Sequence, residues 1–167
     1  MSRDNTLVIR PAVVADAEAI CRIYNQGIED RQATLETALR TPDERRTWLQ
    51  GRSARHPVLV AERDKAVSGW ASLNPFNPRA CYDPVGDFSL YVERSERGTG
   101  IGRRLLEALI GRARALDYHK LVLAAFPYNE AGGALYARCG FRTVGIYREH
   151  GILDGRWVDV MLMELLL

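Results

Sequence analysis

The chain has 167 residues, of which 47% are hydrophobic, and its 23 basic and 21 acidic side chains leave a net charge of +2. This size and composition predict one domain over residues 1–167, and the even mixing of charges excludes nucleic-acid arms and basic membrane-surface segments. No stretch approaches the roughly 18 apolar residues of a membrane span, and the first residues lack a signal-peptide core, so we expect a cytoplasmic protein with no nucleic-acid or membrane partner.

Cysteine and histidine usage predicts neither disulfides nor a metal site. Cys21, Cys81 and Cys139 are odd in number and show no C-x-x-C spacing, which is typical of reduced thiols. The three histidines are equally scattered along the chain.

The first part of the chain predicts a short strand and two helices. Residues 7–10 form the strand, and Asp16 stands where it would cap a helix with apolar residues at helical spacing from 20 to 28. The sequence Thr41-Pro42-Asp43-Glu44 combines a capping residue, a proline in the first turn and a glutamate that reaches back. We expect this second helix to run to about Arg52.

A hairpin and a long loop come next. Residues 58–61 and 67–71 are apolar and flank a polar turn, which predicts two antiparallel strands. Residues 73–85 contain three prolines and two asparagines and predict a loop. Loops of this length inside a compact domain are often functional.

The second half alternates strands with helices. Strands first and αβ units later predict an α/β (α+β) domain, with a mixed central sheet flanked by helices. The expected elements are a strand at 88–92, a helix with an apolar stripe from 105 to 116, a strand at 121–124, a short helix at 130–138 followed by Gly140, and closing strands at 143–146 and 157–162.

The run from Arg97 to Arg103 is the clearest candidate binding site. It reads Arg-Gly-Thr-Gly-Ile-Gly-Arg and lies between the strand at 88–92 and the helix that follows. Glycines let the backbone approach a ligand closely, and the unpaired N–H groups and dipole of a helix start favour an anion. With an arginine at each end, this turn predicts a phosphate site.

Two common phosphate motifs do not fit this run. A P-loop requires Gly-Lys-Ser/Thr, which the run lacks. The dinucleotide fingerprint G-x-G-x-x-G meets Arg103 or Leu105 where its third glycine is required. The pattern that remains is Arg-x-x-Gly-x-Gly.

This pattern and the order of elements resemble the GCN5-related N-acetyltransferase (GNAT) superfamily. The resemblance is to its phosphinothricin N-acetyltransferase branch, which also contains enzymes acting on arsinothricin and on methionine sulfone or sulfoximine. Each matching stretch is unspecific alone, but their order and spacing are specific and span nearly the whole chain. The stretches are residues 16–17, 23–25, 87–92, the glycine run, Asn129, residues 135–136 and 140–141, and residues 155–160.

The resemblance implies a GNAT fold with acetyl-CoA as co-substrate and no metal. The pantetheine arm would lie like an added strand along Leu90, Tyr91 and Val92, and Asn129 would contact its far side. From the residues alone, Asn129 is equally a helix cap. The pyrophosphate would sit on the amides of Arg97, Gly98, Thr99, Gly100, Ile101, Gly102 and Arg103.

Acetyl transfer from a thioester to an amine requires removal of an ammonium proton, donors for the oxyanion and a proton for the departing thiolate. Asp87 stands where the family carries a glutamate base, and because aspartate is shorter we expect a bridging water. A main-chain N–H of residues 90–92 would serve the oxyanion, and Tyr136 is the candidate general acid. The structural alternatives are a solvated carboxylate for Asp87 and a packed tyrosine for Tyr136.

The acceptor site is expected in the proline-rich loop. Arg79 and Tyr82 align with residues that hold the acidic end of the substrate in phosphinothricin enzymes, and a guanidinium binds two oxygens of such a group at once. A solvated loop arginine is the alternative for Arg79. Asn77 stands where some relatives have a second basic residue, and Glu36 stands near a substrate-binding arginine of the strict phosphinothricin enzymes, so phosphinothricin itself is expected to be a poor substrate. Trp157 is expected to be in the core or to wall the pocket.

The favoured function is acetylation of a small amino acid or amino-acid analogue by direct transfer in a ternary complex. A protein N-terminal acetyltransferase is one alternative, against which the loop bearing Arg79 argues. A non-catalytic acyl-CoA-binding sensor is another, against which Asp87 and Tyr136 argue. The resemblance also suggests a homodimer, and the apolar residues 157–167 are expected to form an edge strand that a partner covers.

Overall fold

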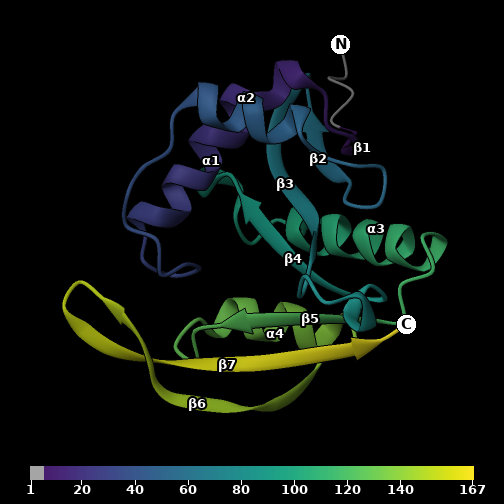
Figure 1. The fold of residues 1–167 in the computed structure, drawn as a ribbon. Coiled ribbons are helices and arrows are strands. Elements are labelled where there is room, and N and C mark those ends of the chain that lie inside the picture. Colours follow the sequence, from purple (N-terminus) through teal and green to yellow (C-terminus); the bar gives the residue numbers. More distant parts are fainter. Residues whose placement is uncertain (1–5) are drawn as a thin grey trace.

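The computed structural model describes residues 6–167 and joins its strands into one seven-stranded sheet (Figure 1). The strands lie side by side in the order β1-β2-β3-β4-β5-β7-β6. They are β1 (Val8–Pro11), β2 (Val58–Arg63), β3 (Ala66–Pro75), β4 (Val85–Val92), β5 (Lys120–Ala125), β6 (Arg142–Leu153) and β7 (Arg156–Leu166). The helices are α1 (Ala17–Glu29), α2 (Pro42–Gln50), α3 (Ile101–Ala115) and α4 (Glu130–Arg138).

The sheet is mixed, as predicted, because β4 and β5 are parallel while the other neighbours pair antiparallel. The parallel pairing is short: it joins Val85, Gly86 and Asp87 to residues 120–122 of β5. Beyond Asp87, β4 keeps its partner β3 as far as Val92 but no longer pairs with β5. The sheet therefore opens between β4 and β5 along residues 88–92.

The core lies on both faces of the sheet because side chains alternate along each strand. On one face, Ile20, Ile23 and Ile28 of α1 pack in a cluster with Val60 and Trp70. On the other face, the leucines of α3 pack in a second cluster with Leu59, Ala61, Ala71 and Leu73 of the same two strands. Helices α1 and α3 thus cover opposite faces of β2 and β3.

The predicted helix cap is confirmed at α2, but the predicted side-chain cap of α1 is wrong. Thr41 accepts a hydrogen bond from the Glu44 amide, and Glu44 accepts one from the Thr41 amide at 2.6 Å, so the predicted capping box starts α2. Asp16 does precede α1, but its carboxylate accepts hydrogen bonds from Arg10 and from the Val13 amide instead of capping the helix. An arginine on β1 competes successfully for this carboxylate because a charged pair is the stronger partner.

Several predicted boundaries shift. Helix α2 ends at Gln50, two residues before Arg52, and β3 runs to Pro75, which shortens the expected loop. Strand β7 lies between β5 and β6, so the expectation that it forms an edge is wrong, and the edge strand is β6. Trp157 is 60% exposed, so it belongs neither to the core nor to the pocket wall. The expected lack of a signal sequence concerns residues 1–5, which lie outside the described residues.

Candidate active site

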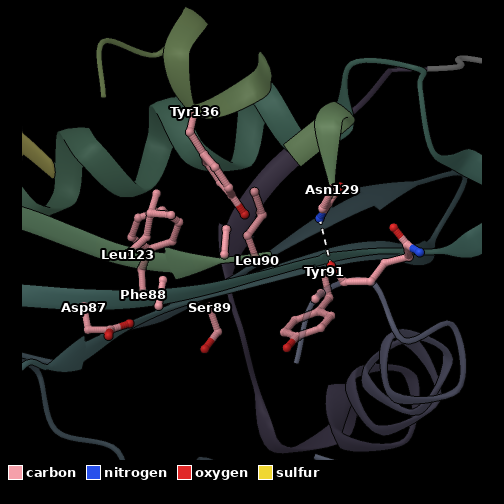
Figure 2. Close-up of a pocket in the computed structure, with 12 residues that line it drawn as sticks. Asp87, Phe88, Ser89, Leu90, Tyr91, Leu123, Asn129 and Tyr136 are labelled. Atoms are coloured by element: carbon pink, nitrogen blue, oxygen red, sulfur yellow. Dashed lines mark hydrogen bonds between the residues drawn. The ribbon is translucent and has the colours of Figure 1, made fainter. Parts of the chain in front are cut away.

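A pocket occupies the opening between β4 and β5 (Figure 2). Its walls are residues 87–91 of β4, residues 123–125 of β5, Gln32 and Ala33 from the segment after α1, Asn129, and Tyr136 of α4. Because β4 and β5 cease to pair here, main-chain groups of β4 border the pocket. An extended ligand with amide groups can hydrogen-bond to such an edge as an added strand does.

Side chains of β4 alternate across this opening. Figure 2 shows Asp87, Ser89 and Tyr91 on one side of the strand and Phe88 and Leu90 on the other, the side from which Tyr136 approaches. The polar and the apolar walls of the pocket therefore follow from the period of two along the strand.

Asp87 is a half-buried carboxylate without a basic partner among its electrostatic neighbours. Burial raises the pKa of Asp87 to about 6, and only a hydrogen bond from the Phe88 amide opposes this shift. A carboxylate with a pKa of this size is ionised at neutral pH yet accepts a proton more readily than a solvated aspartate. The environment of Asp87 suits a general base.

Tyr136 projects from α4 toward β4 (Figure 2). Its ring lies edge-on to Phe88 at 5.9 Å and to Phe141 at 6.2 Å between ring centroids. Burial raises the pKa of Tyr136 to about 12, so its hydroxyl keeps its proton at neutral pH. Tyr136 is thus packed against aromatic rings, as the structural alternative predicts, and it also borders the pocket.

Ser89 is a pocket residue that sequence reasoning missed. Its hydroxyl accepts a hydrogen bond from the Asn74 amide nitrogen at 3.2 Å, and Asn74 in turn accepts one from Arg52 at 3.0 Å. Because Arg52 donates to the side-chain oxygen of Asn74, the side-chain nitrogen of Asn74 must face Ser89. The Ser89 hydroxyl therefore accepts this hydrogen bond and can still donate its own hydrogen to another group. Only the alternation of β4, which places Ser89 on the same side as Asp87, signals this position in the sequence.

The glycine turn has the geometry expected of an anion site. Gly98 and Gly100 have φ angles of +78° and +90°, which side chains rarely adopt, and Gly100 is the N-cap of α3. A Cβ atom added at either glycine would meet no atom within 4 Å, so backbone conformation rather than protein crowding requires glycine there. Thr99 donates its hydroxyl to the Glu96 carbonyl at 2.7 Å, which ties the turn to the residues before it.

The two arginines of this turn are not free charges, contrary to expectation. Arg97 forms an ion pair with Asp30 at 2.6 Å, and Arg103 forms one with Glu107 at 2.7 Å. Arg94 also binds Asp30, and the hydrogen bonds from Arg94 and Arg97 lower the pKa of this carboxyl. Much of the positive charge of the two arginines is therefore offset by Asp30 and Glu107 within the protein.

Asn129 caps α4, as the structural alternative predicts. Its side-chain oxygen accepts a hydrogen bond from the Gly132 amide at 3.1 Å, and its side-chain nitrogen donates one to the Gln32 carbonyl at 3.0 Å. Both polar atoms of the side chain are thus engaged within the protein, while Asn129 still borders the pocket.

The acceptor residues proposed from sequence lie outside the pocket lining. Arg79 and Tyr82 are exposed: Arg79 precedes a single helical turn (Ala80–Tyr82) before β4, and Tyr82 is the last residue of that turn. The Tyr82 ring packs edge-on against Phe76, and the Arg79 amide donates to the Asn77 side chain. The structure joins this loop directly to the strand that carries Asp87.

The described part of the chain shows neither a metal-binding cluster nor a membrane-spanning helix. Residues 6–167 contain no group of three or more His, Cys, Asp or Glu side chains arranged to hold a metal ion. No helix among them is long and apolar enough to cross a membrane.

Comparisons with known proteins show the family of the chain. The family model described as the acetyltransferase (GNAT) family matches residues 20–141. An L-methionine sulfoximine/L-methionine sulfone acetyltransferase of Pseudomonas paraeruginosa is 36% identical over 160 residues, which cover 94% of this chain and 92% of that protein.

Solved structures share the whole fold. A phosphinothricin acetyltransferase of the GNAT superfamily from Sinorhizobium meliloti, in complex with acetyl-CoA, superimposes with a TM-score of 0.89 at 31% identity and covers 97% of this chain and 89% of its own. A ribosomal-protein-alanine N-acetyltransferase from Brucella melitensis superimposes with a TM-score of 0.92 at 38% identity. The match covers 96% of this chain and 99% of that one. The two neighbours are described with different acceptors.

Proposed function

The chain belongs to the GNAT acetyltransferase family and is an N-acetyltransferase, and we propose that its acceptor is a small amino acid or amino-acid analogue. The observation that carries this proposal is the opening between β4 and β5, which has Asp87 and Tyr136 on its walls. Relatives described as acting on methionine sulfoximine, methionine sulfone and phosphinothricin support an acceptor of this size and polarity.

The residues present fit acetyl-CoA as co-substrate. In the proposed pose the pantetheine arm follows the open edge of β4 at Leu90, Tyr91 and Val92, where no β5 partner competes for the main chain. The pyrophosphate lies on the amides of the glycine turn at the start of α3, where N–H groups and the helix dipole favour an anion.

Asp87 and Ser89 serve the acceptor amine in this proposal. The Asp87 carboxylate takes the ammonium proton through one water, which the Ser89 hydroxyl orients from the same side of the strand. The neutral amine then attacks the thioester carbonyl, and a main-chain N–H of residues 90–92 stabilises the oxyanion. As the C–S bond breaks, the Tyr136 hydroxyl gives its proton to the departing thiolate, and the proton that the newly acylated nitrogen loses restores the hydroxyl.

Arg79 is proposed as the anion clamp for the acceptor, with Tyr82 beside it. Arg79→Ala should raise the acceptor KM about 10- to 100-fold, since a hydrogen bond to a charged group contributes roughly 1.5–3 kcal/mol. The dissociation constant of acetyl-CoA should not change, because the glycine turn is a separate segment. Steady-state kinetics and calorimetry measure the two effects. Arg79→Lys should rescue only part of the loss, because a point charge does not reproduce a two-pronged contact.

A thiol-release assay with acetyl-CoA and a panel of acceptors tests the function. The panel includes methionine sulfone, methionine sulfoximine, phosphinothricin, arsinothricin, aliphatic amines and peptides that begin with alanine. We expect the acidic or strongly polar amino-acid analogues to give the highest kcat/KM. If alanine peptides outrank all of them, the acceptor is a protein N-terminus, as the description of the Brucella neighbour suggests for that protein.

We also propose a homodimer that covers the β6–β7 hairpin. The hairpin extends beyond the rest of the sheet (Figure 1), and exposed apolar side chains line it at Val144, Ile146, Tyr147, Ile152 and Trp157. Ile152 and Trp157 face each other across the hairpin, and an apolar pair of this kind on an edge favours association.

Light scattering at micromolar concentration should therefore report twice the mass of one chain. The double variant Ile152→Ser/Trp157→Ser should be monomeric, because it removes the apolar pair without altering the core. A monomeric native protein would contradict the dimer but not the acetyltransferase function.

A further inference from the structure

Arg52 is a half-buried guanidinium that has no carboxylate among its electrostatic neighbours in residues 6–167. It donates instead to the His56 carbonyl at 2.9 Å, to the Leu73 carbonyl, and to the side-chain oxygen of Asn74 at 3.0 Å. Removing a cation from water without a counter-ion costs stability. The contact with Asn74 is the one that leads toward the pocket.

Asn74 connects this arginine to the pocket. It lies directly opposite Asp87 in the β3–β4 pairing, so the two side chains are on the same face of the sheet. Its side-chain nitrogen donates to the hydroxyl of Ser89, which lines the pocket on the side of Asp87 (Figure 2). Because a guanidinium has donors only, Arg52 selects the amide orientation in which this nitrogen faces Ser89. The hydrogen bonds thus run in one direction, from Arg52 through Asn74 to Ser89.

The direction of these hydrogen bonds decides how Ser89 can meet a water molecule. In the proposed proton transfer, the water accepts one hydrogen bond from the acceptor ammonium and one from Ser89, and it points a hydrogen at the Asp87 carboxylate. The ammonium proton moves to the water as that hydrogen moves to Asp87, so the water is regenerated and the carboxylate carries the proton. If Ser89 accepted a water hydrogen instead, it would compete with Asp87 for the same water.

We propose that Arg52 and Asn74 are positioning residues: they hold the Ser89 hydroxyl as a donor toward this water and so promote removal of the acceptor proton. Neither side chain is part of the pocket lining, so both act through Ser89. This role rests on the proposed function, in which Asp87 is the base, and it extends that function to two residues that touch no reactant.

Asn74→Asp reverses the hydrogen bond to Ser89 with little change in shape. The carboxylate still accepts from Arg52, but it has no hydrogen to give, so Ser89 donates to it and turns a lone pair toward the water. We expect kcat for methionine sulfone, measured on the high-pH plateau of each protein, to fall about three- to tenfold, the range for one lost hydrogen bond. The acceptor KM and the dissociation constant of acetyl-CoA should change little, because the variant alters no group that binds either molecule.

Ser89→Ala decides whether Asn74 acts through Ser89. This single variant should lower kcat by a similar factor. In the double variant, Asn74→Asp should have almost no further effect, because no hydroxyl is left to reverse. Losses that multiply in the double variant would show that Asn74 acts independently of Ser89 and would overturn the proposal. An unchanged kcat in Asn74→Asp would overturn it too.

Arg55 provides a matched control for Arg52. It is also half-buried, lies over an aromatic ring (Tyr118) and donates to two main-chain carbonyls. Arg52 alone of the two also binds Asn74. Lysine keeps the charge but not the planar fork of donors, so Arg52→Lys frees the Asn74 amide to turn. Arg52→Lys should lower kcat, though less than Asn74→Asp, because the freed amide still adopts the original orientation part of the time. Arg55→Lys should keep the native kcat.

Melting temperatures separate this effect from a general loss of stability. Both lysine variants lose hydrogen bonds to main-chain carbonyls and should melt at a lower temperature than the native protein, yet only Arg52→Lys should lose kcat. Equal losses of kcat in the two variants, or a native kcat in Arg52→Lys, would overturn the role of Arg52. If the native protein acetylates none of the acceptors, the proposed function fails and this role fails with it. An active native protein whose losses multiply contradicts this role alone.

Discussion

Asp87→Asn should lower turnover by about 10²–10⁴-fold while acetyl-CoA still binds, since this is the usual contribution of a positioned base. The amide has the shape of the carboxylate but accepts no proton, and no other carboxylate borders the pocket lining. Tyr136→Phe should lose less, because a thiolate leaves tolerably without help. Stopped-flow or steady-state measurement of thiol release, with calorimetry for binding, separates the two steps.

The pH dependence of kcat/KM tests whether Asp87 acts as the base. With the pKa of Asp87 near 6, kcat/KM of the native protein should rise with pH through about 6 and then level off, because the base must be ionised. Asp87→Asn should lack this rise. A variant that keeps nearly the full rate across the pH range would show that Asp87 is structural and that the acceptor is deprotonated elsewhere.

The same shift has a consequence for stability. The pKa of Asp87 is raised from 3.8 in an exposed chain to about 6 in the folded protein, so the folded state binds the proton more tightly. The contribution of Asp87 to the stability of the native protein should therefore fall as the pH rises from about 4 to about 6, so the melting temperature of Asp87→Asn should rise relative to that of the native protein over this range. At pH 8 we expect the inactive variant to have the higher melting temperature, as is common where a base is held in a buried site.

Gly100→Val should weaken acetyl-CoA binding about 10- to 100-fold, equivalent to roughly 1–3 kcal/mol. Gly100 has a φ of +90°, which strains a β-branched residue, and the space beside its Cα is open to the ligand rather than filled by protein. The valine would therefore disturb the amides of the turn and occupy the space proposed for the pyrophosphate. Arg97→Ala should cost less, because Asp30 already offsets part of its charge. Calorimetry on the folded variants measures both effects.

Gly111 offers a matched control for this substitution. It lies in α3, where a Cβ atom would meet nothing within 4 Å, and its backbone is helical. Gly111→Ala should leave binding unchanged and stabilise the protein by about 0.5–1 kcal/mol. Combined with Gly100→Val, it compensates for part of the strain, so affinities can be compared in folded proteins. Unchanged affinity in that double variant would remove the basis for placing the pyrophosphate on this turn.

Elements with strong local signals could be predicted from the sequence. The capping box at Thr41 specifies the start of α2 through atoms only three residues apart. The glycine turn requires φ angles that its own residues permit, and it does lead from β4 into α3. Such features depend only on residues close together in the sequence, so they can be predicted before the fold is known.

The full length of the β6–β7 hairpin was not predicted, although a signal was present. Asp154 and Gly155 have φ angles of +49° and +75°, typical of the two-residue turn that Asp-Gly favours. The exposed apolar residues around it obscure the alternation by which a half-buried strand is recognised. The Asp154-Gly155 dipeptide alone predicts a tight turn that joins the two closing strands into one hairpin.

Contacts between distant residues could not be predicted from the chain alone. The pairing of Arg97 with Asp30 spans 67 residues, and the bond from Asn129 to Gln32 spans 97. The first changes the charge of the glycine turn, and the second adds a pocket wall from a segment with no local signal. Both depend on tertiary packing, which no periodicity records.

If acetyl-CoA lies along the open edge of β4, main-chain hydrogen bonds rather than side chains would provide much of its binding. If residues 90–92 hold the pantetheine arm through N–H and C=O groups, replacing Leu90 with alanine leaves those groups in place. Alanine substitutions along this strand would then change the affinity for acetyl-CoA very little. Only a change that removes a backbone donor, such as Val92→Pro, would lower it. In that case the side chains at residues 90–92 could change without loss of acetyl-CoA binding, because the point at which β4 and β5 separate would determine the site.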